Sequence, residues 1–196
     1  MVTPTTILDP TILEHLKRNR LLREGHFVYR SGRHSAALLD RDRLLADPAA
    51  ASRMGYALAK RFFIDHIETV AAPSIWGAGL AQWVGYFLEP KAKVVYATPV
   101  DGSVEIAEHL IDHIAGKRVL LIDNLVMTGE TIRQFLETMD RVGATVLGVG
   151  ALWNAASPAI SDRPVPGLLN LVYEAFAEDA CPICDAGGPE PEVIPY

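Results

Sequence analysis

Cysteine is scarce in this chain, and positive charge is not in excess. Cys181 and Cys184 are the two cysteines among 196 residues, and the formal net charge is −6 with a pI of about 5.5. This acidic balance disfavours a general nucleic-acid-binding surface. The first residues lack the basic-then-apolar pattern of a signal peptide, so we expect a cytoplasmic protein in a reducing environment.

The sequence also lacks an uninterrupted apolar run in its longest candidate for a membrane span. Residues 70–88 carry no charge and reach the necessary length, but Pro73 and several glycines and polar residues interrupt them. We therefore expect a buried strand, loop and helix there, and no membrane partner. The overall composition, 49% hydrophobic and 21% charged, is that of a globular protein, and the length suits one domain.

The most informative stretch is residues 118–131, RVLLIDNLVMTGET. Its apolar residues predict a buried strand that ends at Asp123, and the apolar spacing from Ile132 to Gly143 predicts a helix. A helix N-terminus offers backbone N–H groups to an anion, and Gly129 lets the main chain approach it. Asp123 would lie at the carboxyl end of the strand, where α/β sheets bind ligands. The stretch predicts a phosphate site, although an apolar strand before a Thr-Gly turn also occurs without one.

The spacing matches neither GxxxxGK[ST] nor GxGxxG. It resembles the signature with which type I phosphoribosyltransferases bind 5-phosphoribosyl 1-pyrophosphate (PRPP). Residues 25–35, GHFVYRSGRHS, resemble the N-terminal hood of orotate phosphoribosyltransferases, and residues 72–77, APSIWG, stand where that family has its pyrophosphate loop. The ending Cys181-Pro182-Ile183-Cys184 is similar to one in part of the family, so the resemblance covers roughly residues 10–185.

The resemblance implies an α/β fold with a mostly parallel sheet, helices on both faces and a small N-terminal hood. Strands that alternate with helices along the sequence favour the same arrangement. We expect one domain over residues 1–177, with the hood at about 10–45 and the core at about 46–177, and a loosely held Cys/Pro/Gly-rich tail over 178–196. Helices are expected from Pro10, from Pro48 and over 77–88. Strands are expected over 25–29, 36–40, 69–72, 94–97, 119–122, 145–152 and 168–173, with a hairpin or flap over 98–106 and a Pro/Ser-rich connection over 153–167.

The resemblance also implies an activity: transfer of ribose 5-phosphate from PRPP to a nitrogenous base, orotate or a related one, with Mg2+ and release of pyrophosphate, by a homodimer. Asp123 and Asn124 would hold the ribose hydroxyls, and residues 126–131 the phosphate. The implied PRPP-binding residues are Asp123, Asn124, Val126, Met127, Thr128, Gly129, Glu130 and Thr131. The implied pyrophosphate loop is Ser74, Ile75, Trp76 and Gly77, and the hood turn near the base is Arg30, Ser31, Gly32 and Arg33.

Four departures from the orotate pattern concern charge. Asn124 replaces a second carboxylate, Trp76 stands where a basic residue is usual, residues 97–106 contain no Lys or Arg, and residues 153–155 lack the base-binding arginine. Losing one preorganised donor costs about 2.7–4 kcal/mol of transition-state stabilisation. No catalytic residue is therefore assigned. Replacement cations could come from Lys91, Lys93, Arg33, His34 or a neighbouring subunit.

These departures leave two functional alternatives open. A pocket lined by Trp76 and Trp153 would suit a neutral flat base by stacking, although both residues could simply pack in the core. The second alternative to orotate transfer is a non-catalytic, regulatory protein that binds PRPP or a nucleotide and has lost the cations of its catalytic loop.

Cys181 and Cys184 have the spacing of half a zinc site. The chain has no second CxxC, so four thiolates would have to come from two subunits. A redox pair lacks the usual thioredoxin-like context, and packing of the tail is the simplest interpretation. His109 and His113 lie one helical turn apart and are expected on a solvated face.

Overall fold

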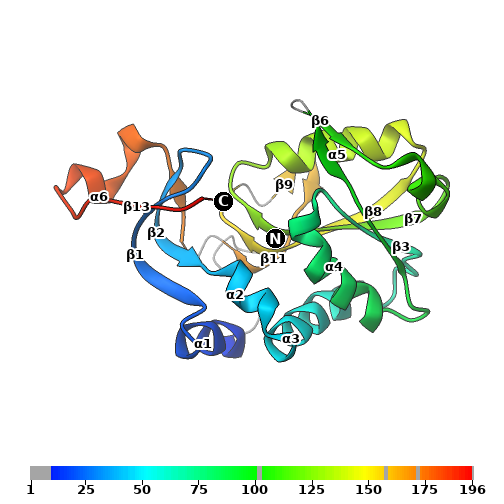
Figure 1. The fold of residues 1–196 in the computed structure, drawn as a ribbon, viewed down its shortest axis with the longest axis horizontal. Helices are drawn as coiled ribbons and strands as arrows, with labels where there is room; N and C mark the ends of the chain where they lie inside the picture. The colour runs from blue at the N-terminus through cyan, green and yellow to red at the C-terminus, as the bar shows by residue number, and fades with distance from the viewer. Residues whose placement is uncertain (1–9, 101–102, 157–158, 171–172, 196) are drawn as a thin grey trace.

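The computed structural model describes residues 10–100, 103–156, 159–170 and 173–195. Its centre is a five-stranded parallel sheet in the order β11-β8-β7-β3-β4 (Figure 1). In chain order its strands are β3 (Thr69–Ala72), β4 (Lys93–Tyr96), β7 (Arg118–Val126), β8 (Thr145–Asn154) and β11 (Gly167–Asn170). The expected parallel α/β sheet is confirmed.

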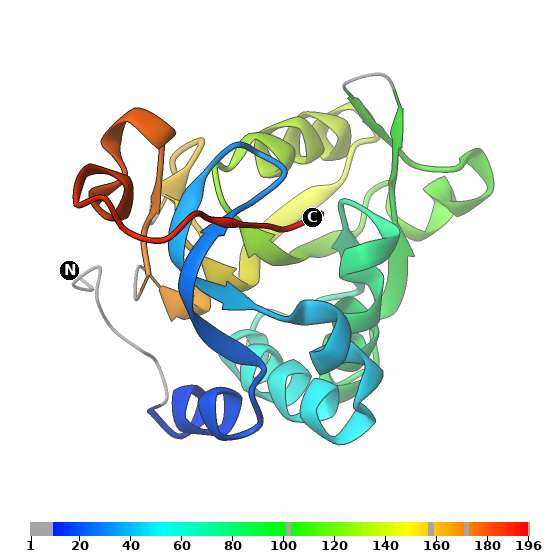
Figure 2. The ribbon, with the colours of Figure 1, turned by 60° about the vertical axis from the view of Figure 1, so that its left-hand side comes forward.

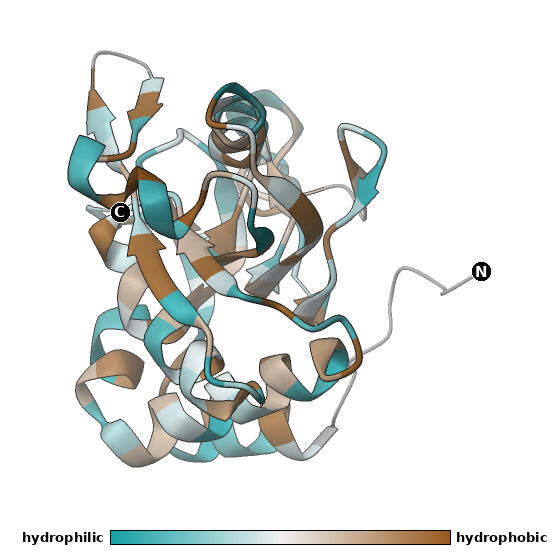
Figure 3. Cartoon of the chain, turned by 90° about the vertical axis from the view of Figure 1, so that its right-hand side faces the viewer, coloured by the Kyte–Doolittle hydropathy of each residue, from teal (hydrophilic) through white to brown (hydrophobic). Residues whose placement is uncertain are grey.

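Strand β7 shows why this sheet is covered on both faces. Side chains alternate between the two faces of a strand. Leu120 and Ile122 belong to one hydrophobic cluster, together with residues of α3 (Pro48–Ala59) and α4 (Ile75–Phe87), whereas Val119 and Leu121 belong to a second cluster with α5 (Glu130–Arg141). All four side chains are fully buried. An apolar run without polar alternation is what such a doubly covered strand requires. Figure 3 colours the chain by hydropathy, and brown stretches occur on its strand arrows as well as on its helices.

The expected helix boundaries follow from capping residues. Asp47 precedes α3, and its Oδ1 accepts hydrogen bonds from the backbone N–H groups of Ala49 (2.9 Å) and Ala50 (3.4 Å), while Pro48 occupies the first helical turn. Helix α5 ends before Gly143, whose φ of +72° suits glycine. The first two helices are α1 (Pro10–Arg18) and α2 (Arg41–Ala46), and short 3-10 turns occur at Lys60–Phe62, Glu108–His113 and Glu178–Ala180.

A second, four-stranded sheet forms the hood beside the core, in the order β12-β2-β1-β13. The hairpin of β1 (Leu22–Val28) and β2 (His34–Leu39) was expected, although it begins earlier than predicted. The outer strands β12 (Ala175–Phe176) and β13 (Glu192–Val193) come from the C-terminal part of the chain. Figure 2 shows this last segment, in red, crossing the hood. The expectation of a loosely held tail was therefore wrong, because the tail completes the hood sheet.

Other local predictions were partly wrong. Trp76 lies in the first turn of α4, which begins at Ile75 and not at Gly77. The predicted connection over 153–167 contains the end of β8 and the paired strands β9 (Ala159–Ile160) and β10 (Arg163–Pro164). The expected hairpin is confirmed as β5 (Thr98–Val100) and β6 (Ser103–Glu105), with residues 101–102 outside the described part. Within the described residues, no helix has the length and apolar character needed to cross a membrane.

Candidate functional site

The predicted phosphate loop lies between the end of β7 and the start of α5. Strand β7 continues to Val126, beyond the predicted end at Asp123, so the loop itself is residues 127–129. Gly129 caps the helix with φ +82°, and a Cβ there would lie 2.6 Å from Cδ1 of Ile160. The position therefore requires glycine both for its backbone conformation and for space. The N–H groups of Thr131 and Ile132 in the first turn of α5 can face an anion, whereas that of Glu130 donates to Thr128 and that of Arg133 to the Gly129 carbonyl.

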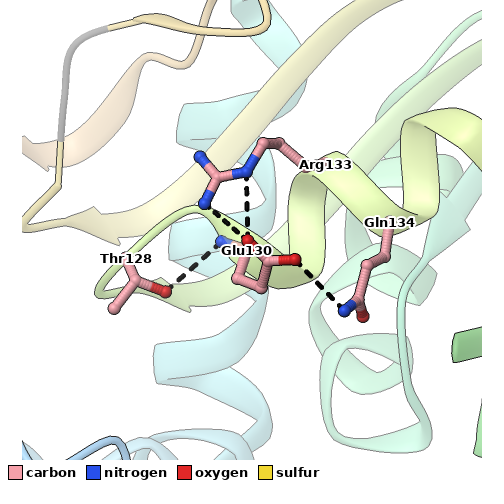
Figure 4. A network of polar contacts seen from close by, with 4 residues as sticks. All are labelled: Thr128, Glu130, Arg133 and Gln134. Atoms are coloured by element: carbon pink, nitrogen blue, oxygen red, sulfur yellow. Dashed lines mark hydrogen bonds and ion pairs between the residues drawn. The ribbon is translucent and has the colours of Figure 1, made fainter. Parts of the chain in front are cut away.

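Side chains on this loop divide between the cavity and the outer face of α5. Thr128 Oγ1 accepts from the backbone N–H of Glu130 at 3.3 Å. The Glu130 carboxylate accepts from Arg133 (Nη2 at 2.6 Å) and from Gln134 (Nε2 at 3.2 Å), as Figure 4 shows. The Arg133 guanidinium lowers the pKa of Glu130. Glu130 is thus occupied along the helix surface, and its predicted contact with PRPP stays a prediction.

A cavity of about 200 Å³ opens in front of this loop. Three segments that are distant in sequence form its wall: the hood turn, the start of α2, and the passage from β7 into α5. Its lining residues are Tyr29, Ser31, Arg41, Asp123, Leu125, Val126, Met127, Thr128, Gly129, Thr131 and Ile132. The structure therefore brings six of the eight predicted PRPP-binding residues to one cavity.

Asp123 is the carboxylate of this cavity. Burial raises its pKa from 3.8 to about 6, while the Asn124 backbone N–H, which donates to Oδ1 at 2.7 Å, and the charge of Arg41 act in the opposite direction. Asp123 is therefore ionised above about pH 6 and protonated below it. An ionised carboxylate at the end of a parallel strand can accept hydrogen bonds from sugar hydroxyls or bind a cation.

Asn124 points to a different partner. Its side chain is fully buried, and Nδ2 donates to the backbone carbonyl of Trp76 at 2.6 Å. Its Oδ1 has no hydrogen-bond partner among the described residues. The amide thus ties the start of α4 to β7. Its predicted role at the ribose hydroxyls stays a prediction.

The predicted pyrophosphate loop becomes the start of α4. Ser74 precedes the helix, and Ile75 and Trp76 are 56% and 59% exposed. Gly77 is buried and tightly packed. An added Cβ would lie 3.1 Å from Cβ of Ala72 and 3.3 Å from the carbonyl oxygen of Ile122. The backbone of this turn therefore packs directly against the sheet, while Trp76 extends outward.

A second cavity, of about 420 Å³, lies under Trp76 and is lined by Arg30, Arg41, Asp42, Trp76 and Pro195. The guanidinium carbon of Arg41 lies 5.4 Å from the Trp76 ring centroid, and Arg41 Nε lies 3.6 Å from Asp42 Oδ1. The Arg41 side chain is 14% exposed and borders both cavities. Sequence reasoning missed Arg41. The one sequence feature that could have indicated Arg41 is its position soon after a buried strand. The local sequence, Arg41-Asp42-Arg43, does not show which of its two arginines faces the cavities and which is exposed.

The hood turn contributes to both cavities. Gly32, with φ +74°, donates its N–H to the Tyr29 carbonyl at 2.8 Å and allows the chain to reverse. Ser31 then lines the first cavity and Arg30 the second. Arg33 is half-buried beside the turn, and neither cavity includes it or Gly32 among its described lining residues.

The other proposed sources of positive charge lie elsewhere. Lys91 is exposed, pairs with Glu89 at 3.3 Å and lies over the Tyr86 ring, and Lys93 is exposed at the start of β4. His34 lies in the hood against Cys184, with Nδ1 3.4 Å from Sγ. None of these three is among the described lining residues of either cavity.

Trp153 and Asn154 occupy the place where a base-binding arginine was expected. Trp153 is 1% exposed and makes edge contacts with Tyr29 and Tyr173. Asn154 is buried and donates to the Val165 carbonyl at 2.8 Å. Trp153 is therefore a core residue, and of the two tryptophans considered for stacking only Trp76 borders a described cavity.

Comparison with known proteins places the chain in a family. A phosphoribosyl transferase domain model matches residues 87–166, which include the phosphate loop. An orotate phosphoribosyltransferase of Thermus thermophilus is 34% identical over 184 residues, covering 93% of this chain and 99% of the relative. The chain belongs to the orotate phosphoribosyltransferase family. The Thermotoga maritima member of that family is 28% identical over 179 residues, covering 91% of this chain and 94% of its own.

Solved structures show the same fold for this orotate phosphoribosyltransferase family member. Orotate phosphoribosyltransferase of Mycobacterium tuberculosis H37Rv, in complex with inorganic phosphate, superposes with a TM-score of 0.60 at 19% identity, covering 83% of this chain and 97% of that one. The adenine phosphoribosyltransferase of Thermoanaerobacter pseudethanolicus gives 0.62 at 20% identity, covering 79% and 97%. The likeness extends to enzymes for different bases, so the fold alone does not select the base.

Proposed function

We propose that this enzyme transfers the 5-phosphoribosyl group from PRPP to orotate, or to a closely related base, and releases pyrophosphate. The observation that carries this proposal is the cavity between hood and core, where the phosphate loop, Asp123 and Arg41 meet. The relatives at 28% to 34% identity are orotate phosphoribosyltransferases, and this chain spans nearly their whole length.

The site divides the substrates between its two cavities. The loop at 127–129 and the start of α5 supply backbone N–H groups for the 5-phosphate of PRPP. Asp123 lines the same cavity as this loop, so the ribose attached to the bound 5-phosphate would lie beside it. Its carboxylate can accept hydrogen bonds from the ribose hydroxyls. The second cavity suits a flat anion, because Trp76 offers a ring face and the two arginines, Arg30 and Arg41, outweigh the single carboxylate of Asp42 on the same wall. Orotate is such an anion.

Catalysis in this arrangement rests on charge. As the bond between ribose C1 and pyrophosphate loosens, positive charge grows on the ribose and negative charge on the leaving group. Asp123, ionised above about pH 6, stabilises the positive charge on the ribose. Arg41, at the boundary of the two cavities, stabilises the negative charge on the pyrophosphate. Holding both substrates in adjacent cavities removes most of the entropic cost of their encounter.

We propose Mg2+ as the cofactor. Magnesium usually binds through one or two carboxylates together with substrate phosphates, and Asp123 is a carboxylate on the wall of the first cavity, so the residues fit this ion. When bound, Mg2+ neutralises charge on the pyrophosphate. Asn124 is fully buried and is not among the described lining residues of this cavity, whereas Asp123 is, so Asp123 is the ligand that we assign to this chain.

Calorimetric titration of PRPP with Mg2+ into the purified protein tests the phosphate site. Thr128→Ala is expected to weaken binding, because its hydroxyl orders the turn before α5, whereas Thr145→Ala, at an exposed position on the far end of β8, is the matched control. Equal affinity in both variants would contradict the assignment of the loop.

A non-catalytic PRPP-binding role remains the second candidate, because residues 97–106, which span the β5–β6 hairpin, contain no Lys or Arg. Thr138 Oγ1 donates to the Val104 carbonyl at 2.8 Å and ties the hairpin to α5. PRPP binding without release of pyrophosphate in the presence of orotate would favour this role over transfer.

We also propose a homodimer. Exposed apolar side chains gather near α3 and α4: Tyr56 (49% exposed), Phe63 (43%), Ile64 (85%) and Tyr86 (53%). Tyr56 contacts both Phe63 and Phe87, and Phe87 contacts Tyr86, so these four aromatic residues form one patch, and such patches mark association surfaces. Sedimentation equilibrium is expected to give a dimer that Tyr56→Asp dissociates. A monomeric wild-type protein would contradict it.

We propose that the enzyme is cytoplasmic, because its two cysteines form no disulfide, which suits a reducing compartment. Cell fractionation with an antibody against the full chain is expected to recover it with the soluble contents, and recovery with the membrane fraction would contradict this assignment.

A further inference from the structure

Two histidines and two cysteines converge inside the hood, away from both cavities. His26 lies on β1, His34 on β2, Cys181 immediately before α6 (Pro182–Asp185), and Cys184 within α6. One ligand atom from each residue lies within 4.8 Å of all the others. Cys181 is fully buried and both histidines are 5% exposed. The proposed transfer reaction uses none of the four.

Their spacing matches a tetrahedral metal site. Zinc binds sulfur at about 2.3 Å and nitrogen at about 2.0–2.1 Å, so a tetrahedral ion separates a sulfur and a nitrogen ligand by roughly 3.5 Å. His26 Nε2 lies 3.6 Å from both cysteine sulfurs, and His34 Nδ1 lies 3.4 Å from Cys184 Sγ. The two ring nitrogens are 2.9 Å apart, slightly closer than the ion requires.

The hydrogen bond on the far side of His26 prepares it as a ligand. His26 Nδ1 lies 2.7 Å from the Pro189 carbonyl. A carbonyl can only accept, so Nδ1 is the donor in this bond, and Nε2 is the ring nitrogen that faces the cluster. Metal-binding histidines are commonly oriented by such a bond to a backbone carbonyl. The donor set and this orientation agree.

We propose that His26, His34, Cys181 and Cys184 bind one Zn2+ ion per chain as a closed structural site. Four protein ligands leave no open position for substrate, which distinguishes structural from catalytic zinc. Four thiolates would have to come from two subunits, whereas in this arrangement two histidines of the same chain complete the ligand set. They are separated from the cysteines by about 150 residues.

The ion would fix the C-terminal segment on the hood and thereby shape the second cavity. Beyond α6 the chain pairs with β1, Ile194 donates its N–H to the Val28 carbonyl at 2.8 Å, and Pro195 then lines the cavity beside Arg30. His26 and His34 also lie on either side of the hood turn that carries Arg30. The zinc site is therefore a positioning device for one wall of that cavity.

Metal analysis of the full-length protein tests the proposal. We expect about one zinc ion per chain after purification without added metal, and a similar stoichiometry when Zn2+ alone is titrated into protein stripped with a chelator. Co2+ in place of zinc is expected to give the absorption of a tetrahedral ion with thiolate ligands. Cys184→Ser and His34→Ala each remove a direct ligand and are expected to weaken zinc binding by more than the roughly 10–100-fold that loss of an outer-shell partner causes. The control His109→Ala, at an exposed histidine, should retain it.

A structural role predicts a loss of stability that does not depend on substrate. The stripped wild-type protein is expected to melt at a lower temperature and to recover on addition of Zn2+, and limited proteolysis should then cleave within residues 178–195. This comparison uses wild-type protein throughout, so it remains decisive if a variant does not fold. Protein that neither contains nor takes up zinc, a Cys181–Cys184 disulfide in the purified chain, or half an ion per chain would each overturn the proposal.

Discussion

Replacing Arg41 is the sharpest perturbation of the proposed reaction. Arg41 is the cation that borders both cavities, its side chain is 14% exposed, and its guanidinium is held over the Trp76 ring. A preorganised donor to developing negative charge is worth about 2.7–4 kcal/mol, so Arg41→Ala is expected to lower kcat/KM by roughly 10²–10³. Arg41→Lys keeps the charge but loses the planar guanidinium, so its kcat/KM should lie between that of the wild-type enzyme and that of Arg41→Ala.

The assay is steady-state pyrophosphate release with PRPP and orotate varied in turn. Arg43→Ala is the matched control, because Arg43 lies on the same short helix, is exposed and borders neither cavity. A second readout is the pH profile. The charge of Arg41 lowers the pKa of Asp123, so Arg41→Ala should raise that pKa and move the acid limb of kcat/KM to higher pH. Equal kinetics in the Arg41→Ala and Arg43→Ala variants, with an unchanged acid limb, would refute the reasoning.

Three further outcomes follow from single residues. Burial raises the pKa of Asp123 to about 6, so turnover should fall as the pH drops through that value. The same shift means that the ionised carboxylate destabilises the folded state at pH 8. Asp123→Asn should therefore raise the free energy of unfolding at pH 8 by on the order of 1–3 kcal/mol in urea titrations. Gly129→Ala should abolish PRPP binding by calorimetry, whereas Gly116→Ala, at φ +70° with open space, should cost only stability. Asp47→Ala removes the cap of α3 and should lower stability by about 1 kcal/mol, measured as a lower Tm with kcat unchanged.

Each of these has a contradicting result. Full activity at pH 5, or an Asp123→Asn protein less stable than wild type at pH 8, would contradict the assigned titration. PRPP binding by Gly129→Ala with wild-type affinity would mean that the loop tolerates a side chain. An unchanged Tm for Asp47→Ala would show that the Asp47 cap does not stabilise α3.

The phosphate loop was predictable because its geometry is local. An apolar strand, a short loop with Gly129 and a periodic helix lie within about 25 consecutive residues, and each has its own sequence signal. The same holds for α3 after Asp47 and for β3, whose bounds match the prediction. These elements need no knowledge of what packs against them.

The rest of the site depends on contacts between distant segments. Arg41 is important because its side chain lies over the Trp76 ring and its charge acts on Asp123. No sequence pattern near residue 41 indicates these long-range contacts. Trp153 was considered for the base pocket, but the hood residue Tyr29 packs against its edge. The Cys181–Cys184 pair had the spacing of half a metal site, and its partners came from strands at the other end of the chain.

The tail was misread for a related reason. Proline and glycine over residues 186–195 usually indicate loose structure, and the stretch has little periodicity. Its order comes from β13 pairing with β1, from the ion pair of Arg23 with Glu192 at 2.8 Å, and from the hydrogen bond that the Pro189 carbonyl accepts from His26. All three partners belong to the hood, so the local sequence could not reveal them.

The most direct test of the central claim is the rate of orotate-dependent pyrophosphate release from PRPP by the purified wild-type protein with Mg2+. The account predicts turnover that requires both substrates and that falls by roughly 10²–10³ in Arg41→Ala. PRPP binding with no orotate-dependent release, under conditions in which the protein is folded and zinc-loaded, would contradict transfer to orotate by these residues.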